Sequence, residues 1–123
     1  MSYYAVWMDS RECKVFEFTP GKVKEQHIKM SGHETMGHKQ TDKHTVPHEF
    51  YNQIVEKVKN AHELLLLGPG QAKTQFSSFL ETHHQKDLKK KIVGIENMDH
   101  PTQPQIVAHA RKFFKAHNLF ESI

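Results

Sequence analysis

The stretch LLLLGPGQAKTQF, from Leu64 to Phe76, restricts the fold of this chain more than any other segment. Four consecutive leucines are typical of a strand that is buried on both faces. The Gly-Pro-Gly sequence that follows leaves room only for a tight turn, and the residues after it suit a helix. Strands that alternate with helices require parallel crossover connections. The segment therefore indicates an α/β fold.

The same segment differs from the phosphate loop that wraps a nucleotide. That loop needs a glycine, four residues and then Gly-Lys-Ser/Thr, whereas here Ala72 precedes the lysine and Leu67 stands where the first glycine belongs. The short turn can still hold an anion, because the first N–H groups of a helix have no partners within the helix. We therefore predict that Gly68, Gly70 and Lys73 contact a phosphate group without wrapping a triphosphate.

Hydrophobic periodicity predicts the other elements. Alternating apolar residues and the turn sequences DSRE and TPGK indicate three short antiparallel strands, and apolar residues three or four positions apart indicate helices. Thr102 and Gln105 form a capping box that opens the last helix. The predicted order is strands at 3–8, 13–19 and 23–29, a helix after Pro47, a strand at 64–67, a second helix, a strand at 92–96 and a final helix.

This order predicts one mixed five-stranded sheet, in which three antiparallel strands are followed by alternating helices and strands. With 123 residues, 37% of them hydrophobic, and no internal repeat, the chain fits a single domain over residues 1–123. No apolar run reaches the length of a membrane span, and the first residues lack the features of a secretory signal. We therefore expect a cytoplasmic protein.

The formal net charge of +3 is modest, but eleven histidines add positive charge as the pH falls below neutral. Basic residues cluster at 86–92, where Lys89, Lys90 and Lys91 are consecutive. Such a run is commonly the solvated approach to a strand, and the alternative is a patch that contacts phosphate groups. The single Cys13 lies in a predicted strand, and we assign it no role.

Several segments resemble a known family of translation proteins. The strand followed by Gly-Pro-Gly-x-x-Lys-x-x-Phe is similar to a segment in the central domain of archaeal and eukaryotic peptide chain release factors and of the rescue factor Pelota. The sequences WMDSRECKVFEF, a His-rich loop, LLLLGPGQAKTQF and VGIENMDHPTQPQIVAHARKFF occur in the order seen in small bacterial relatives of that domain, the translational machinery proteins. The resemblance covers nearly the whole chain and implies the ribonuclease-H-like fold.

The resemblance implies a place in translation rather than a particular reaction. In the release factors, the loop after the third strand carries Gly-Gly-Gln, which reaches the peptidyl-tRNA ester. The corresponding loop at 31–48 has Gly37, His38, Lys39 and Gln40 but no adjacent pair of glycines. Those glycines give the backbone the freedom that places the glutamine, so we do not expect peptide release. The implied partners are the ribosome and ribosomal or transfer RNA, with no cofactor.

A two-metal nuclease site is one alternative to binding. Ribonuclease-H-like enzymes gather carboxylates from the first strand, the first helix and the fourth strand around two divalent cations. Asp9 and either Glu49 or Glu56 fit the first two positions, but the LLLLG strand has no carboxylate. This favours binding over metal-dependent cleavage. Asp9 is better interpreted as the start of the DSRE turn.

The histidine-rich loop is a second candidate site, because long loops in compact domains are often functional. His33, His38, His44 and His48 could supply imidazole ligands to zinc, but their spacing matches no standard zinc finger and no cysteine assists them. We interpret them as histidines of a solvated loop, with metal binding as the alternative.

A third candidate site lies at the ends of the two parallel strands, where open sheets bind their ligands. It combines the turn at 68–70 with Lys73, Glu96, Asp99 and His100. Lysine, aspartate and histidine side chains together could perform acid–base chemistry. The alternative is that Lys73 and Asp99 form a pair that only orders the loop before the last helix.

The sequence therefore favours a translation-associated α/β domain that binds the ribosome or structured RNA, in a stalling, rescue or stress setting. One alternative is an RNA-cleaving or esterase-like enzyme that uses the third site or the histidine loop. The other is a module that docks a protein partner through the aromatic residues at 113–120, although such residues are more commonly part of a core.

Overall fold

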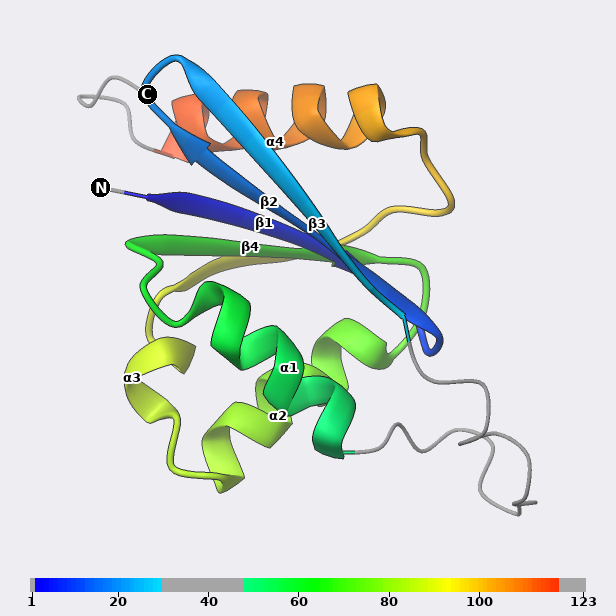
Figure 1. Ribbon diagram of the computed structural model, residues 1–123, viewed down its shortest axis with the longest axis vertical. Helices are drawn as coiled ribbons and strands as arrows, with labels where there is room; N and C mark the ends of the chain where they lie inside the picture. Colours follow the sequence, from blue (N-terminus) through cyan, green and yellow to red (C-terminus); the bar gives the residue numbers. More distant parts are fainter. Residues whose placement is uncertain (1, 30–47, 118–123) are drawn as a thin grey trace.

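A computed structural model describes residues 2–29 and 48–117 of the chain (Figure 1). This part of the chain forms five strands and four helices, in the order β1 (Tyr3–Met8), β2 (Glu12–Thr19), β3 (Lys22–Lys29), α1 (His48–Val58), β4 (Glu63–Gly68), α2 (Ala72–Thr82), α3 (Lys86–Lys89), β5 (Ile92–Asn97) and α4 (Gln103–His117). All of the predicted elements are present, and only α3 was not predicted.

The strands form one open sheet in the order β3-β2-β1-β4-β5. The central strand β1 pairs antiparallel with β2 and parallel with β4, and β4 pairs parallel with β5. All six residues of β1 and the four leucines of β4 are buried, as expected for strands that are covered on both faces. The predicted mixed five-stranded α/β fold is therefore confirmed.

Helices cover both faces of the sheet (Figure 1): α1, α2 and α3 lie on one face and α4 lies on the other. Successive residues of a strand point to opposite faces, so β1 and β4 contribute to two separate cores. Val6 and Leu66 lie in the core beneath α1 and α2, whereas Trp7 and Leu67 lie in the core beneath α4. The two cores meet only through the sheet, and β1 therefore holds both layers together.

The last helix begins at the predicted capping box. The Thr102 N–H donates to Gln105 Oε1 at 2.8 Å, and the Gln105 N–H donates to Thr102 Oγ1 at 3.4 Å. Ile106, Ala110 and Phe114 follow at helical spacing and are fully buried against the sheet. The cap and this apolar stripe fix where α4 starts and which of its faces contacts the sheet.

The short helix α3 falls in the basic run at 86–92. Leu88 is its buried residue and packs into the core beneath α1 and α2. A single apolar residue among lysines gives no periodic pattern, which is why the sequence did not predict this helix.

No helix in the described part of the chain is long and apolar enough to cross a membrane.

Cys13 points into the core beneath α1 and α2 and is fully buried. Burial raises the pKa of its thiol above the ordinary value, and the carboxylates of Asp9 and Glu12 add to the shift. A thiol that stays protonated is a poor nucleophile, so Cys13 acts in this structure as a packed apolar residue.

Candidate functional site

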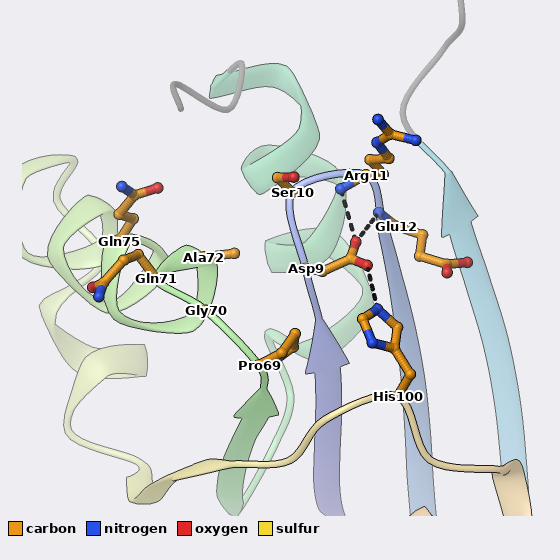
Figure 2. Close-up of a pocket in the computed structure, with 10 residues that line it drawn as sticks. All are labelled: Asp9, Ser10, Arg11, Glu12, Pro69, Gly70, Gln71, Ala72, Gln75 and His100. Atoms are coloured by element: carbon orange, nitrogen blue, oxygen red, sulfur yellow. Dashed lines mark hydrogen bonds and ion pairs between the residues drawn. The ribbon is translucent and has the colours of Figure 1, made fainter. Parts of the chain in front are cut away.

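The carboxyl ends of β1 and β4 open onto a hollow of about 720 Å³ (Figure 2). Its walls are the β1–β2 turn at 9–12, the β4–α2 turn and first helical turn at 69–72, Gln75 of α2, and His100. After β4 the chain continues into α2 on one face of the sheet, and after β5 it continues into α4 on the other face. Open α/β sheets bind their ligands at such a point of divergence.

Main-chain atoms make the contact between β1 and β4 next to the hollow. Gly68 ends β4 directly beside β1, and a Cβ atom at Gly68 would collide with the carbonyl oxygen of Met8. The Met98 N–H donates to the Gly68 carbonyl at 2.9 Å, so the segment after β5 is attached at the same place. Glycine is required here because only a residue without a Cβ lets the two strands approach so closely.

Asp9 organises the turn between β1 and β2. Its Oδ1 accepts hydrogen bonds from the backbone N–H of Arg11 at 2.8 Å and of Glu12 at 2.9 Å. The Asp9 N–H in turn donates to the Glu12 carbonyl at 3.1 Å. The interpretation of Asp9 as a turn residue is therefore confirmed. Its second carboxylate oxygen takes no part in the turn and faces His100 (Figure 2).

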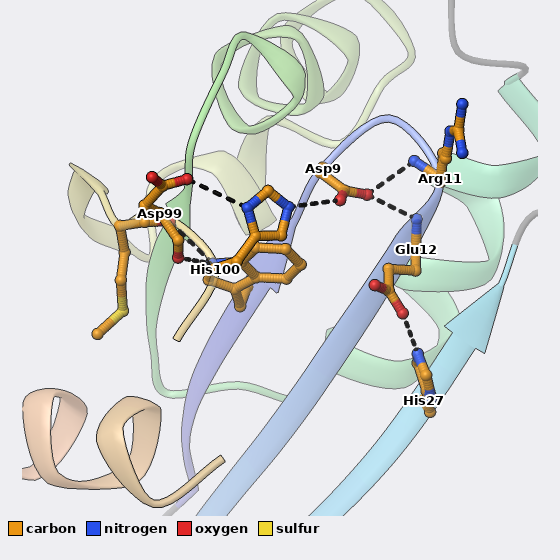
Figure 3. A network of polar contacts seen from close by, with 8 residues as sticks. Asp9, Arg11, Glu12, His27, Asp99 and His100 are labelled. Atoms are coloured by element: carbon orange, nitrogen blue, oxygen red, sulfur yellow. Dashed lines mark hydrogen bonds and ion pairs between the residues drawn. The ribbon is translucent and has the colours of Figure 1, made fainter. Parts of the chain in front are cut away.

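His100 lies between two carboxylates (Figure 3). Its Nε2 is 3.5 Å from Asp9 Oδ2, and its Nδ1 is 3.1 Å from Asp99 Oδ1. The imidazole also packs edge-on against Trp7, with ring centroids 5.3 Å apart. The His100 side chain is 67% exposed and that of Asp9 is 19% exposed, so the histidine is open to a ligand while the aspartate is held in the wall.

Trp7 holds the loop that carries His100. The indole Nε1–H lies 3.0 Å from the Met98 carbonyl oxygen and 3.3 Å from that of Asp99, and the ring is buried beneath α4. A buried indole that donates to the backbone fixes the loop more firmly than exposed side chains can. The position of His100 therefore depends on a residue of the central strand.

A second hollow, of about 530 Å³, lies on the other side of His100. It is bounded by residues 98–101 and by Gln105, Ala108 and His109 at the start of α4. The Nε2 of His109 is 2.7 Å from Glu96 Oε1, so Glu96 faces α4 rather than the first hollow. His100 is the residue that both hollows share.

The structure brings together only part of the crevice that the sequence predicted. Gly70 and His100 line the first hollow, and Asp99 contacts His100. Glu96 pairs with His109 on the side of α4. The Lys73 ammonium donates to the Gly70 carbonyl at 2.7 Å instead of pairing with Asp99.

Lys73 is buried, although the sequence suggested a charge directed outward. The residue is only 4% exposed, and burial lowers the pKa of its ammonium below the ordinary value. The reason is that α2 starts only a few residues after β4 ends, so Ala72 and Lys73 in its first turn are already covered. A contact between Lys73 and phosphate stays a prediction.

We expect Lys73→Met to change the free energy of unfolding by less than about 1 kcal/mol at pH 7, because methionine fills a similar volume and removes a poorly hydrated charge. Lys73→Ala should lower it by about 2 kcal/mol through lost packing of the aliphatic stem. Urea denaturation of both variants measures these effects. A Lys73→Met variant as unstable as Lys73→Ala would show that the ammonium itself stabilises the fold.

A comparison of the wild-type protein with Lys73→Met gives a pH test. Because the folded-state pKa of Lys73 is lowered, the unfolded chain binds this proton more tightly than the folded protein does. Wild-type stability should therefore gain a contribution as the pH rises towards the ordinary lysine pKa of about 10.4. Lys73→Met should lack this contribution, and denaturation at pH 7 and pH 10 compares the two.

The predicted basic patch is largely engaged within the protein. Lys89 Nζ is 2.7 Å from Glu81 Oε1, and this hydrogen bond lowers the pKa of the Glu81 carboxyl. Lys91 Nζ donates to the Ala61 carbonyl at 3.1 Å. Lys90 is exposed and forms no ion pair with any described residue. Of the three consecutive lysines, Lys90 is therefore the most available to a ligand.

Most of the histidine loop falls outside the described residues, and its predicted metal or functional positions stay predictions: His33, Gly37, His38, Lys39, Gln40 and His44. His48 begins α1, with its ring 4.6 Å from that of His83 and 5.1 Å from that of Phe79, measured between centroids. Within residues 2–29 and 48–117, no three His, Cys, Asp or Glu side chains are grouped to hold a metal ion.

Sequence reasoning missed Asp9, Arg11 and Gln75 as residues of the hollow. A usable signal was present, because the DSRE turn and the Gly-Pro-Gly turn both follow strands at their carboxyl ends. What the sequence did not provide was the position of β4 beside β1. That pairing places the two turns next to each other.

The strand order and the placement of the helices define an α/β fold with a mixed five-stranded sheet. This is the arrangement that the resemblance to the ribonuclease-H-like fold implied. No family model matches the sequence, and no curated protein matches it. Solved structures do match. Pelota from Archaeoglobus fulgidus aligns with a TM-score of 0.62 and 14% identity over 90% of this chain.

Two further solved structures have the same arrangement. Dom34 from S. cerevisiae aligns with a TM-score of 0.60 and 18% identity over 95% of this chain. The archaeal termination factor aRF1 aligns with a TM-score of 0.58 and 13% identity over 94% of this chain. The chain spans about a third of the length of the three proteins, namely 31% of Pelota, 34% of Dom34 and 40% of aRF1. At these identities the similarity establishes the fold.

Proposed function

We propose that the protein acts in translation, in the cytoplasm, by binding the ribosome or a structured RNA. The observation that carries this proposal is the fold shared with Pelota, Dom34 and aRF1. Dom34 is a translation termination-like factor that is involved in RNA quality control pathways and interacts with Hbs1. The protein aRF1 is an archaeal translation termination factor. Because this sequence has no adjacent pair of glycines, we propose binding rather than peptide release.

Basic side chains near the hollow and on α3 would supply the contacts to RNA phosphates. Arg11 is exposed beside the hollow and, like Lys90, has no ion-pair partner in the described part of the chain. The contacts predicted at Gly68, Gly70, Lys73, Lys89 and Lys91 belong to the same proposal. Each phosphate contact by a lysine or arginine makes binding weaker as the salt concentration rises.

Co-sedimentation of the purified protein with ribosomal particles from its own cell tests this function. We expect binding at low salt that is lost at high salt. Arg11→Ala and Lys90→Ala should each reduce the slope of log affinity against log salt by about one unit. Lys59→Ala is the matched control, because Lys59 pairs with Glu56 on α1 at 3.0 Å. Protein that stays in the supernatant at every salt concentration would contradict the proposal.

A further inference from the structure

The two edges of the sheet differ in how they are protected from other strands. β3 forms one edge and β5 forms the other. β3 has the sequence KVKEQHIK, and charged side chains on an edge strand discourage pairing with another chain. β5 has the sequence IVGIEN, and Glu96, its only charged residue, is paired with His109. The edge at β5 therefore lacks the charges that protect the edge at β3.

The backbone of β5 has hydrogen-bonding groups that face away from the sheet. The Met98 N–H donates to the Gly68 carbonyl of β4 at 2.9 Å. Because these groups alternate in direction along a strand, Ile95 and Asn97 direct their N–H and C=O groups away from β4. Within residues 2–29 and 48–117, no hydrogen bond reaches these outward groups. The outer edge of β5 can therefore accept a further strand.

An apolar side chain lies at the same edge. Ile95 is 41% exposed, and no other large apolar side chain is exposed in the described part of the chain. Its neighbour on β4 is Leu66, which is fully buried in the core beneath α1 and α2. Ile95 therefore points to the same face as Leu66 but lies beyond the cover of these helices. A strand added at β5 would remove Ile95 from water.

The charges on the two sides of β5 complement each other. Lys90 precedes the strand and is exposed, and Asp99 follows the strand with a side chain that is 92% exposed. In an antiparallel pair of two copies, the start of one β5 lies near the end of the other, so Lys90 of each copy lies near Asp99 of the other. A parallel pair would place like charges together, which is unfavourable. The charges therefore favour a second copy in the antiparallel orientation.

We propose that the protein forms a symmetric dimer in which β5 pairs antiparallel with β5 of a second copy, with the two-fold axis at Ile95. A residue on this axis lies opposite itself, so the two Ile95 side chains contact each other and their outward backbone groups exchange two hydrogen bonds. The two five-stranded sheets become one continuous sheet. An interface built on one pair of strands is small, so we expect a dissociation constant on the order of 10 μM.

Sedimentation equilibrium of the purified chain between about 1 and 200 μM tests the proposal. We expect the mass to rise from the monomer value of 14.4 kDa towards twice that value. Ile95→Lys should weaken the dimer at least about tenfold, because it places two positive charges together at the axis. Gln26→Lys is the matched control, since it adds the same charge at an exposed position of the β3 edge and should leave the dimer unchanged. A monomer at every concentration, or a dimer that Ile95→Lys leaves unchanged, would overturn the proposal.

Charge reversals test the orientation of the two strands. Lys90→Glu and Asp99→Lys should each weaken the dimer about threefold or more, since the dimer contains this contact twice. The variant that combines both reversals should regain most of the lost affinity, because each copy again presents opposite charges to the other. A combined variant that dimerises more weakly than either single variant would contradict the antiparallel arrangement.

Amide hydrogen exchange of the wild-type protein locates the interface without any substitution. Raising the protein concentration should slow the exchange of the outward Ile95 and Asn97 amides and leave the amides of β3 unchanged. Slower exchange in β3 instead would place the contact at the other edge and overturn the proposal.

The outcomes also separate this inference from the proposed function, on which it does not depend. A dimer through β5 without co-sedimentation of ribosomal particles would support the interface and contradict the ribosomal role. Co-sedimentation of a protein that stays monomeric would do the reverse.

Discussion

Gly68→Ala should lower the free energy of unfolding by about 3 kcal/mol, at the upper end of the usual cost of overpacking. The new methyl group would collide with the Met8 carbonyl oxygen, which belongs to the backbone of the central strand. No side-chain rotation can relieve this contact, so the ends of β1 and β4 must separate. Urea denaturation followed by the fluorescence of Trp7, the single tryptophan, measures the loss.

Gly70→Ala is the matched control for this substitution. A Cβ atom at Gly70 would meet nothing within 4 Å, and its backbone conformation does not require glycine. We expect a change of less than about 0.5 kcal/mol. If the two alanine variants lost equal stability, the close approach of β1 and β4 would not be the cause.

Phe114→Ala should lower the free energy of unfolding by about 4 kcal/mol, as expected for truncating a fully buried aromatic side chain. The Phe114 ring centroid lies 5.2 Å from that of Tyr3 and 6.1 Å from that of Phe18, so it joins α4 to both β1 and β2. In the described part of the chain, α4 is the helix that covers this face of the sheet. The same urea denaturation measures this loss.

Phe114→Leu provides the comparison, because it keeps most of the buried volume and should cost about 1.5 kcal/mol or less. Phe113→Ala should also cost less than Phe114→Ala, since Phe113 is only partly buried. A small effect of Phe114→Ala would mean that α4 contributes little to the stability of the sheet. That result would also weaken the argument that the loop before α4 is held rigidly.

The sequence predicted the sheet well because the signals were local. The four leucines from Leu64 to Leu67, the glycines after them, and Thr102 with Gln105 each determine structure through their immediate neighbours. Each predicted strand end either coincides with the observed end or differs from it by one residue. Element type can be read from such patterns because burial, turn geometry and capping involve residues close together in the chain.

The candidate site was predicted only in part because it depends on distant contacts. Asp9 and His100 are far apart in sequence and meet because β1, β4 and β5 are successive neighbours in the sheet. The burial of Lys73 depends on how soon α2 starts after the strand, a distance of a few residues that periodicity does not resolve. Glu96 was assigned to the wrong side of the loop because His109, its partner, belongs to a later helix.

The main-chain contact between Gly68 and Met8 next to the hollow has a consequence for how such a site could change during evolution. The residues that line the hollow come from three separate segments, near Ser10, Gln71 and His100, and none of these three makes that contact. Substitutions in these segments can therefore alter selectivity while the contact between β1 and β4 stays the same. A designer could vary these three segments independently and obtain new ligand preferences on an unchanged frame.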